Sequence, residues 1–212
     1  MPQVNAMLHT EPMAATDSPR LGTALTRRAV LDVATRVYLA GQPLDMSALA
    51  TELGIGRSTL YRLVGNREDL LSTVLAEATE RTFRRAAAQT TSPGGADLVM
   101  EVIDRFMQAV IDAEPLQVLS HREPLLLMRL MLLPGPVEQT AGRLVGQMLQ
   151  SEVAAGRLEL PLPPTVFGEA IVRMCDAHLY APLLGRTEPE IDTALDLVAA
   201  LLRHTRHPTP RR

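Results

Sequence analysis

Two short helical segments joined by a glycine turn constrain this chain more than any other feature. They occupy residues 45–71, which read DMSALATELGIGRSTLYRLVGNREDLL. Leu49 and Leu53 are one helical step apart, and helical spacing of apolar residues resumes after the turn. The turn contains Gly54 and Gly56, and glycine takes the left-handed backbone of a tight turn at low cost. The pattern predicts a helix-turn-helix, whose second helix lies in the major groove of DNA.

The polar side chains of the second helical segment suit nucleic-acid recognition. An arginine can hydrogen-bond guanine O6 and N7 together, so Arg57 is the candidate for direct base readout. Ser58 is expected at a base edge or a phosphate. Thr59 and Tyr61 are expected at phosphates, which fix the register of the protein rather than the sequence it reads. Arg62 is expected to add positive charge at the edge of the groove.

Capping signals predict where the neighbouring helices begin. Asp45 suits the N-cap of the first helix of the motif, and Ser47 in its first turn is a candidate contact to the DNA backbone. Asn66 with Asp69 three residues later forms a capping-box pattern, which predicts that a long helix follows. The first amides of that helix, together with Arg67, are predicted to clamp a phosphate.

These motif residues resemble the DNA-binding domain of the TetR family of bacterial repressors. The resemblance covers about residues 24–75, and its matching stretches are Leu49-Ala50, Leu53-Gly54-Ile55, Ser58-Thr59-Leu60-Tyr61 and Arg67-Glu68-Asp69-Leu70-Leu71. Leu63 and Val64 depart from the family pattern, and Leu63 is expected to pack rather than to contact DNA. The resemblance implies a homodimer that binds a palindromic operator on double-stranded DNA and is released by a small-molecule effector.

Composition predicts an all-α chain. Hydrophobic residues make up 46% of the 212 residues, enough for a real core, and no run of alternating β-branched residues predicts a strand. The net charge of −3 is divided unevenly. Residues 20–72 hold seven arginines and five acids, a net charge of +2, whereas residues 86–212 hold eleven arginines and fifteen acids, a net charge of −4. The sign of this asymmetry agrees with DNA binding by the N-terminal part.

The expected domain order follows from the motif and from breaks in the pattern. The segments are a disordered arm (1–20), a three-helix helix-turn-helix DNA-binding domain (21–72) linked by a helix (67–89), a helical ligand-binding and dimerisation domain (73–204) and a tail (205–212). The arm is polar and has no continuous apolar run, which predicts neither a signal peptide nor a membrane anchor. The single cysteine, Cys175, excludes an intrachain disulfide and suits the cytoplasm.

A ligand cavity is expected among the helices of the C-terminal domain. Its methionines and scarce aromatics favour an aliphatic or acyl-chain ligand, although the same methionines would also serve as core filler. The segment His121-Arg122-Glu123-Pro124, with the Leu/Met run after it, resembles TetR members tied to the degradation of lactone quorum-sensing signals. That resemblance implies a lactone with an alkyl tail. The candidate ligand contacts are Arg105, Phe106, Met107, Met128, Arg129, Met131, Arg173, Met174 and His178.

The last two predicted helices, about 165–183 and 188–203, are candidates for a dimer interface. The family architecture implies that they pair with their symmetry mates in a four-helix arrangement. The pattern alone leaves a core within one chain equally open. The apolar residues concerned are Phe167, Ile171, Met174 and Leu179 on the first helix and Ile191, Leu195, Val198 and Leu202 on the second.

Other functional classes have weaker support in the sequence. Cys175, Asp176 and His178 are metal-binding residue types, with His121 as a remote fourth, but residues so close on one helix cannot all face one ion. No metal or other cofactor is therefore expected. No G-x-S-x-G, G-x-G-x-x-G, P-loop or H-E-x-x-H motif indicates an enzyme. The alternative is a helical interaction or ligand-binding protein whose DNA binding is weak or lost.

Overall fold

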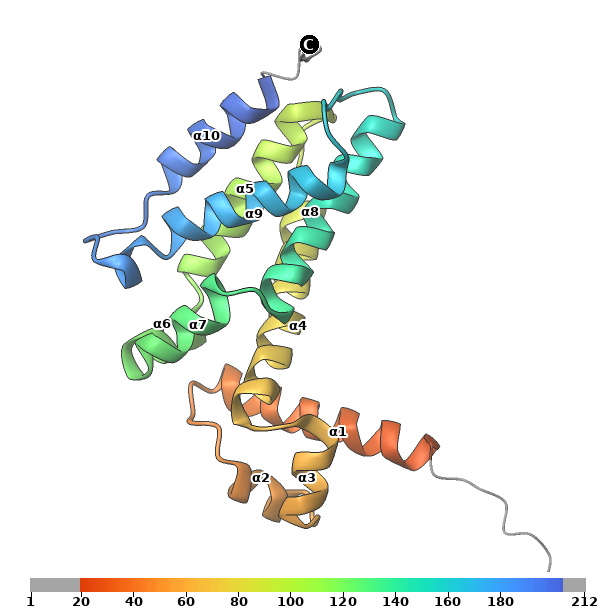
Figure 1. Ribbon diagram of the computed structural model, residues 1–212, viewed down its shortest axis with the longest axis vertical. Coiled ribbons are helices and arrows are strands. Elements are labelled where there is room, and N and C mark those ends of the chain that lie inside the picture. The colour runs from red at the N-terminus through yellow and green to blue at the C-terminus, as the bar shows by residue number, and fades with distance from the viewer. Residues whose placement is uncertain (1–19, 204–212) are drawn as a thin grey trace, which may run out of the picture.

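The computed structural model describes residues 20–203, and their regular structure is entirely helical (Figure 1). This confirms the predicted all-α fold, while the predicted tail and all but the last residue of the predicted arm lie outside the described residues. The α-helices are α1 (Arg20–Leu39), α2 (Met46–Glu52), α3 (Arg57–Val64), α4 (Arg67–Ala88), α5 (Gly95–Ile111), α6 (Glu114–Arg122), α7 (Pro124–Leu132), α8 (Pro136–Ala154), α9 (Pro164–Leu179) and α10 (Ile191–Arg203). A short 3-10 helix, η1 (Ala181–Leu184), separates the last two.

The helix-turn-helix forms where its capping residues predict. The Asp45 carboxylate accepts hydrogen bonds from the backbone N–H groups of Ser47 at 2.7 Å and Ala48 at 2.9 Å, and so caps α2. Gly54 has the expected positive φ of +64°, whereas Gly56 has φ −71° and is the extended N-cap of α3. Only the first glycine of the turn therefore needs the left-handed backbone.

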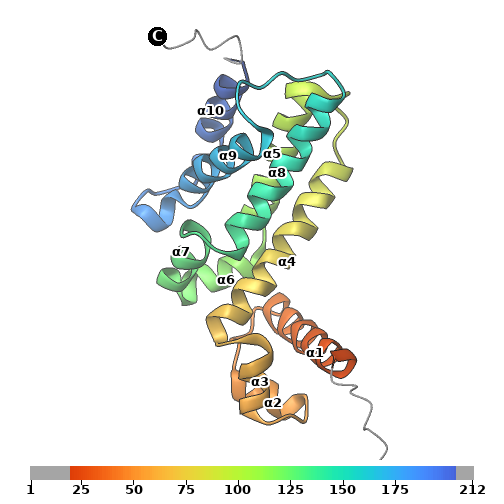
Figure 2. The same ribbon diagram turned by 45° about the vertical axis from the view of Figure 1, so that its right-hand side comes forward.

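Helix α4 joins the two ends of the molecule, as the two views of the ribbon show (Figures 1 and 2). It begins at the predicted capping box, in which the Asn66 side chain accepts from the Asp69 N–H and the Asp69 carboxylate accepts from the Asn66 N–H. Its first half packs with α1–α3, and its second half lies along the helices of the C-terminal part.

The apolar core of the first three helices continues into the C-terminal part of the chain. Val30, Leu60 and Leu70 are fully buried in it, together with Leu127 and Met131 from α7. A second core lies among α5, α8, α9 and α10. Side chains of α6 and α7 pack in the same core as those of α1 and α4. A shift of α6 or α7 therefore changes the packing against α1 and α4.

Most of the apolar side chains of α9 and α10 are buried against other helices of the same chain. Phe167, Ile171, Leu179, Ile191, Val198 and Leu202 are buried in the second core. This is the alternative that the sequence pattern left open, namely an internal core. The outer faces of these helices still expose Val166 and Leu197, together with small residues such as Ala170 and Ala177.

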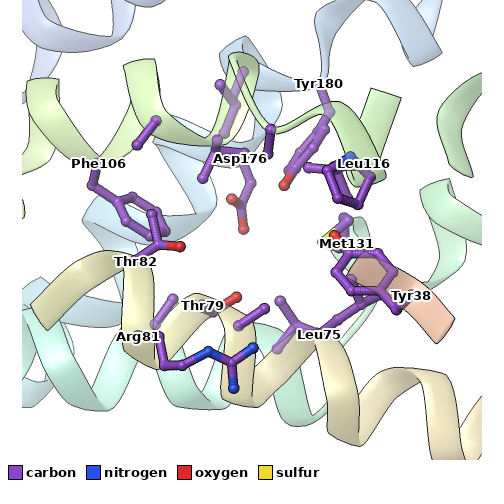
Figure 3. A pocket seen from close by; sticks show the side chains of 18 of the residues that line it. Tyr38, Leu75, Thr79, Arg81, Thr82, Phe106, Leu116, Met131, Asp176 and Tyr180 are labelled. Atoms are coloured by element: carbon purple, nitrogen blue, oxygen red, sulfur yellow. The ribbon is translucent and has the colours of Figure 1, made fainter. Parts of the chain in front are cut away.

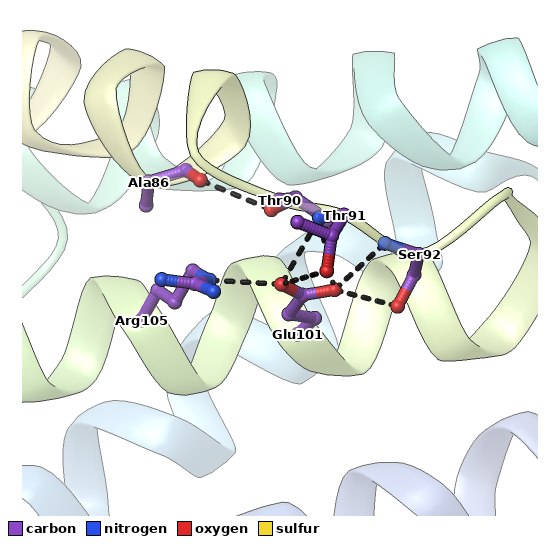
Figure 4. A network of polar contacts seen from close by, with 6 residues as sticks. All are labelled: Ala86, Thr90, Thr91, Ser92, Glu101 and Arg105. Atoms are coloured by element: carbon purple, nitrogen blue, oxygen red, sulfur yellow. Dashed lines mark hydrogen bonds and ion pairs between the residues drawn. The ribbon is translucent and has the colours of Figure 1, made fainter.

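The loop between α4 and α5 is anchored by one carboxylate (Figure 4). Glu101 accepts hydrogen bonds from the backbone N–H groups of Thr91 and Ser92, from the Ser92 hydroxyl at 2.6 Å and from Arg105 Nε at 2.9 Å. The Ser92 hydroxyl is the largest of the interactions that lower the pKa of Glu101 to about 2. Hydrogen bonds to this carboxylate therefore hold the connection between α4 and α5 in place.

Helices α8 and α9 approach closely through glycines. A Cβ placed on Gly168 would lie 2.6 Å from the backbone nitrogen of Gly146 and 2.7 Å from the carbonyl oxygen of Gly142. Both neighbours are backbone atoms, so they cannot move aside cheaply. A Cβ on Gly142 would instead meet Glu169 at 3.5 Å, which is ordinary contact.

We therefore expect Gly168→Ala to destabilise the protein, by about 1–3 kcal/mol, as overpacking of a core does. Gly142→Ala, on the facing helix, should be neutral or stabilising by up to about 1 kcal/mol, because alanine favours the helix and meets no obstacle. Chemical denaturation of the two variants tests this. Equal effects of the two substitutions would contradict the close packing at Gly168.

Candidate DNA-binding surface and ligand cavity

Helix α3 presents one buried and one exposed face. Leu60 and Val64, four residues apart, are buried against α1 and α2. Arg57 and Tyr61 form a second pair at the same spacing and are exposed, with 48% of the Tyr61 surface accessible. Because Leu60 and Val64 are packed in the core, the orientation of α3 is fixed, and its polar face with Arg57 and Tyr61 points to solvent.

The polar side chains of α3 are free to meet a partner. Among residues 20–203, no hydrogen bond or ion pair engages the side chains of Arg57, Ser58, Thr59, Tyr61 or Arg62. Thr59 is partly buried and the other four are exposed. Two cations and three hydroxyls that make no hydrogen bond within the described residues are suited to contact phosphates and bases.

The acidic residues around α3 are already engaged. Asp45 caps α2, and the hydrogen bonds from Ala48 and Ser47 lower its pKa. Glu52 pairs with Arg36 at 3.0 Å on the neighbouring surface. The charge of Glu52 is thus offset by Arg36, whereas Asp45 stays ionised and attracts Arg57, and Arg57 and Arg62 are the positive groups of this face. Ser47 lies beside them, partly buried in the first turn of α2.

Arg67 is placed differently from the other predicted DNA contacts. Its Nε donates to the carbonyl oxygen of Leu44 at 2.8 Å, and its two terminal nitrogens donate to Glu123 at 2.8 and 2.5 Å. The side chain is only 31% exposed. The hydrogen bond with Glu123 raises the pKa of Arg67 and lowers that of Glu123. In this conformation the guanidinium faces the C-terminal part of the chain rather than solvent.

Two further polar contacts connect the same two parts. Arg129 on α7 pairs with Glu68 on α4 at 2.6 Å, and Arg122 at the end of α6 donates to the carbonyl oxygen of Gly41 at 3.0 Å. Both are exposed and therefore weak individually. Together with the bidentate pair of Arg67, they hold the α6–α7 corner against the start of α4 and the α1–α2 loop.

A cavity of about 280 Å³ lies between the two parts of the molecule (Figure 3). Its walls come from seven helices and from Tyr180, just after α9. They include Tyr38 of α1, Leu75, Thr79 and Thr82 of α4, Phe106 of α5, Leu116 of α6, Met131 of α7, Glu138 of α8 and Asp176 of α9. A ligand here would contact both α4 and the helices that hold it.

Polar groups line the cavity both on its α9 side and on its α4 side. Figure 3 shows the Asp176 carboxylate directed into the cavity with the Tyr180 hydroxyl beside it. Burial, with a smaller effect of the Glu138 charge, raises the pKa of Asp176 to about 7. Burial also raises the pKa of Tyr180, and raises that of Tyr38 to about 12. Arg81 and Arg85, both exposed, line the α4 side.

The structure brings two of the nine predicted ligand contacts, Phe106 and Met131, into this cavity. Met107 is buried in the second core, whereas Met128 and Met174 are partly buried elsewhere. The four polar candidates do not line the cavity and each is paired with an acid, of which only Glu138, the partner of Arg173, lines the cavity. Arg105 binds Glu101 (Figure 4), Arg129 binds Glu68, Arg173 binds Glu138 at 2.9 Å, and His178 binds Glu190 at 2.9 Å.

Sequence reasoning missed the polar wall of this cavity. Tyr38 and Thr79 lie on α1 and α4, and their positions in the sequence are next to the DNA-binding motif and give no sign of a cavity. Asp176 does carry a signal, because it is an acidic residue on an apolar helix, but the sequence suggests for it only the role of a metal ligand. In the part of the chain that the structure describes, no group of His, Cys, Asp or Glu side chains could hold a metal ion. Cys175 is buried, and burial raises its pKa to about 12, as a structural thiol requires.

Comparisons with known proteins agree with this architecture. The family model described as "Tetracyclin repressor-like, C-terminal domain" matches residues 94–203. The solved structure of the R. erythropolis transcriptional repressor QsdR from the TetR family is 50% identical, with a TM-score of 0.84, over 89% of this chain and 100% of that chain. No curated protein matches this chain.

Two more distant structures share the fold alone. The TetR family repressor AlkX from Dietzia sp., described as implicated in biodegradation of n-alkanes, is 21% identical with a TM-score of 0.54, over 89% of this chain and 97% of that one. A TetR-family transcriptional regulator from Pectobacterium atrosepticum is 15% identical with a TM-score of 0.56, over 87% and 93%. No helix among residues 20–203 has the length and apolar character to cross a membrane.

The unpaired carboxylate of the cavity predicts a pH-dependent stability. The folded pKa of Asp176, about 7, lies above its ordinary value of 3.8, so the folded state favours the protonated form. Its contribution is therefore fully present below about pH 4 and is lost as the pH rises through 7. We expect Asp176→Asn, which stays neutral, to be more stable than the unmodified protein by up to about 4 kcal/mol at pH 8, which is about 1.4 kcal/mol for each unit of the pKa difference, and by little at pH 4.

Chemical denaturation at several pH values measures this difference. The exposed Asp196→Asn on α10 is the control and should follow the unmodified protein at every pH. The other ionisable groups that line the cavity, Glu138, Arg81, Arg85 and the two tyrosines, are common to both proteins and cancel in the comparison. Parallel stability curves for Asp176→Asn and the unmodified protein between pH 4 and 8 would contradict the burial of this charge.

Proposed function

The chain belongs to the TetR family of transcriptional regulators, and on this premise we propose that it is a repressor released from a palindromic operator by a small, largely apolar effector such as an acyl or lactone compound. Regulators of this family bind operator DNA as dimers, respond to small molecules and are not enzymes. We place its action in the cytoplasm, where the operator DNA is. The observation that supports the proposal most is the unpartnered polar face of α3, held on a buried stripe.

We assign base readout to Arg57 and, with it, Ser58. Thr59, Tyr61, Arg62 and Ser47 would contact phosphates and fix the orientation of α3. A single α3 reads few base pairs, so a dimer that places two copies about 34 Å apart along the DNA gives useful specificity. The outer faces of α9 and α10, with Val166 and Leu197 exposed, are the surfaces that we assign to the dimer contact.

Arg67 connects DNA binding with the effector cavity in this proposal. The sequence pattern predicts that the Arg67 guanidinium binds a phosphate of the DNA. In the present conformation this guanidinium donates two hydrogen bonds to Glu123 instead. The two partners compete, because a guanidinium held by a bidentate carboxylate cannot also clamp a phosphate. The present conformation then corresponds to the state with low DNA affinity.

The effector would favour that state by population shift. The cavity wall contains residues of α4 and of α6 and α7, and Glu123 is the residue between α6 and α7. A ligand that fits the cavity best when this corner is held against α4 stabilises the Arg67–Glu123 pair and lowers the affinity for DNA. Linkage requires that DNA weaken the binding of the effector by the same factor.

The DNA-binding proposal predicts the effect of one arginine. Fluorescence anisotropy should show tight, salt-dependent binding to a palindromic segment from upstream of the protein's own gene. Arg57→Ala should weaken this binding at least about tenfold and relax its specificity, since a bidentate contact to guanine contributes about 1–3 kcal/mol of discrimination. Arg84→Ala, an exposed arginine far along α4, is the matched control and should bind as the unmodified protein does.

If the upstream DNA shows no specific binding, selection from random sequences shows whether the operator lies elsewhere. A selection that recovers no motif would overturn the DNA-binding function and favour the helical ligand-binding or interaction protein that the sequence left as the alternative.

A further inference from the structure

We propose that Arg173 connects the cavity with the contact between two copies of the chain. Its guanidinium binds Glu138 in the cavity wall of its own chain and, in the dimer, Glu169 of the partner subunit. This inference rests on the proposed function, because it specifies which side chains meet in the dimer contact assigned to α9 and α10, and how that contact is coupled to the effector site.

The Arg173 guanidinium is held on one side only. Its Nε donates to Glu138 Oε1 at 2.9 Å, and no other hydrogen bond or ion pair of this side chain occurs among residues 20–203. A guanidinium carries five N–H donors, so most of them are free for another acceptor. The Arg173 side chain is 63% exposed, whereas that of Glu138 is 12% exposed. The ion pair therefore joins a nearly buried carboxylate to a cation on the surface of α9.

Glu169 is an exposed acid without a partner on the same helix. It lies four residues before Arg173, a spacing at which opposite charges pair on the surface of a helix. Arg173 binds Glu138 of α8 instead, and in the part of the chain that the structure describes Glu169 makes no hydrogen bond or ion pair. The surface of α9 thus presents a cation with free donors and an acid with free acceptors.

The spacing of the exposed residues suits a contact between two copies of α9. The residues along its outward face are Val166, Ala170, Arg173 and Ala177, at intervals of four, three and four. This order is the same in both directions, so an antiparallel copy of α9 meets it through the same positions, as a two-fold symmetric interface requires. In this register Arg173 lies over Ala170 of the partner subunit, which leaves room for the arginine stem, and beside Glu169 of the partner subunit.

The two charges also lie on the same flank of this contact. Glu169 and Arg173 both line a groove of about 610 Å³ between α8 and α9, so both are on the side of α9 that faces α8. A two-fold axis between antiparallel helices keeps the α8 side of each copy on one flank. The arginine of each copy therefore faces the acid of the other, and the dimer contains this pair twice.

Glu138 connects this contact with the cavity. It is a wall residue of both the cavity and the groove between α8 and α9. The Asp176 carboxylate points into the cavity (Figure 3), and burial together with a smaller effect of the Glu138 charge raises its pKa, so the two acids are close enough to interact. A ligand that displaces Glu138 therefore shifts Arg173 at the dimer contact, and by linkage the dimer contact changes the affinity of the cavity for that ligand.

Mixtures of charge-reversed variants test the contact between subunits. Arg173→Glu and Glu169→Arg each place like charges together twice in their own homodimer, whereas a mixed dimer of the two variants contains two opposite pairs. Native mass spectrometry of an equimolar mixture of the full-length proteins, one of them carrying a mass tag, measures the fraction of mixed dimer after subunit exchange. We expect at least about 90% mixed dimer instead of the half that random exchange gives, because like charges at an interface are strongly unfavourable.

Arg84→Glu mixed with Glu114→Arg is the matched control. Both residues are exposed and lie on α4 and α6, away from the outward face of α9, so this mixture should contain half mixed dimer. A mixed fraction near half for the α9 variants would overturn the assignment. If those dimers still bind the operator, the proposed repressor stands and only this contact fails. An unmodified protein that sediments as a monomer would contradict both the proposed dimer and this inference.

A double-mutant cycle on the dimer dissociation constant tests the connection with Glu138. Glu138→Gln keeps the shape of the side chain but removes the charge that orients Arg173, and it should weaken the dimer about three- to tenfold. In an Arg173→Met background the same substitution should change the dissociation constant by less than about twofold. Glu114→Gln is the control and should have no effect in either background. An equal loss from Glu138→Gln in both backgrounds would overturn the coupling, because Glu138 would then act on the dimer without Arg173.

Discussion

The arrangement of this molecule depends on the bidentate pair between Arg67 and Glu123. It joins the first turn of α4, next to the helix-turn-helix, to the corner between α6 and α7. The apolar core crosses the same boundary, because Leu127 and Met131 of α7 pack with the residues of α1–α4. The apolar packing of α7 and the Arg67–Glu123 pair therefore act at the same boundary. A tilt of α4 would disturb both of these contacts.

The DNA-binding half of this fold could be read from the sequence because its signals are local. Asp45, Asn66 and Asp69 cap helices within three residues of their partners, and the stripe of Leu60 and Val64 follows from helical spacing alone. One local expectation was wrong: Gly56 does not take a left-handed backbone, since as the N-cap of α3 it needs only an extended one.

The ligand cavity could not be read in the same way, because it is a tertiary feature. Its walls come from seven helices separated by up to about 140 positions, and no spacing rule relates Tyr38 to Asp176. Arg129 and Arg173 are candidate ligand contacts in the sequence, but in the structure they form ion pairs with Glu68 and Glu138. Arg67 shows the same limit, since only the fold reveals Glu123 as a second partner. In the cavity, the informative residue is Asp176, whose carboxylate has no hydrogen-bond or ion-pair partner among the described residues.

The central claim is that Glu123 and DNA compete for Arg67, and a double-mutant cycle on operator affinity tests it most directly. Glu123→Gln should raise the affinity several-fold in the unmodified background, because it frees the guanidinium for a phosphate. The same substitution should have no effect in an Arg67→Ala background, and Glu114→Gln on α6 should have none in either. An equal gain from Glu123→Gln in both backgrounds would contradict the account, because Glu123 would then act on DNA binding without Arg67.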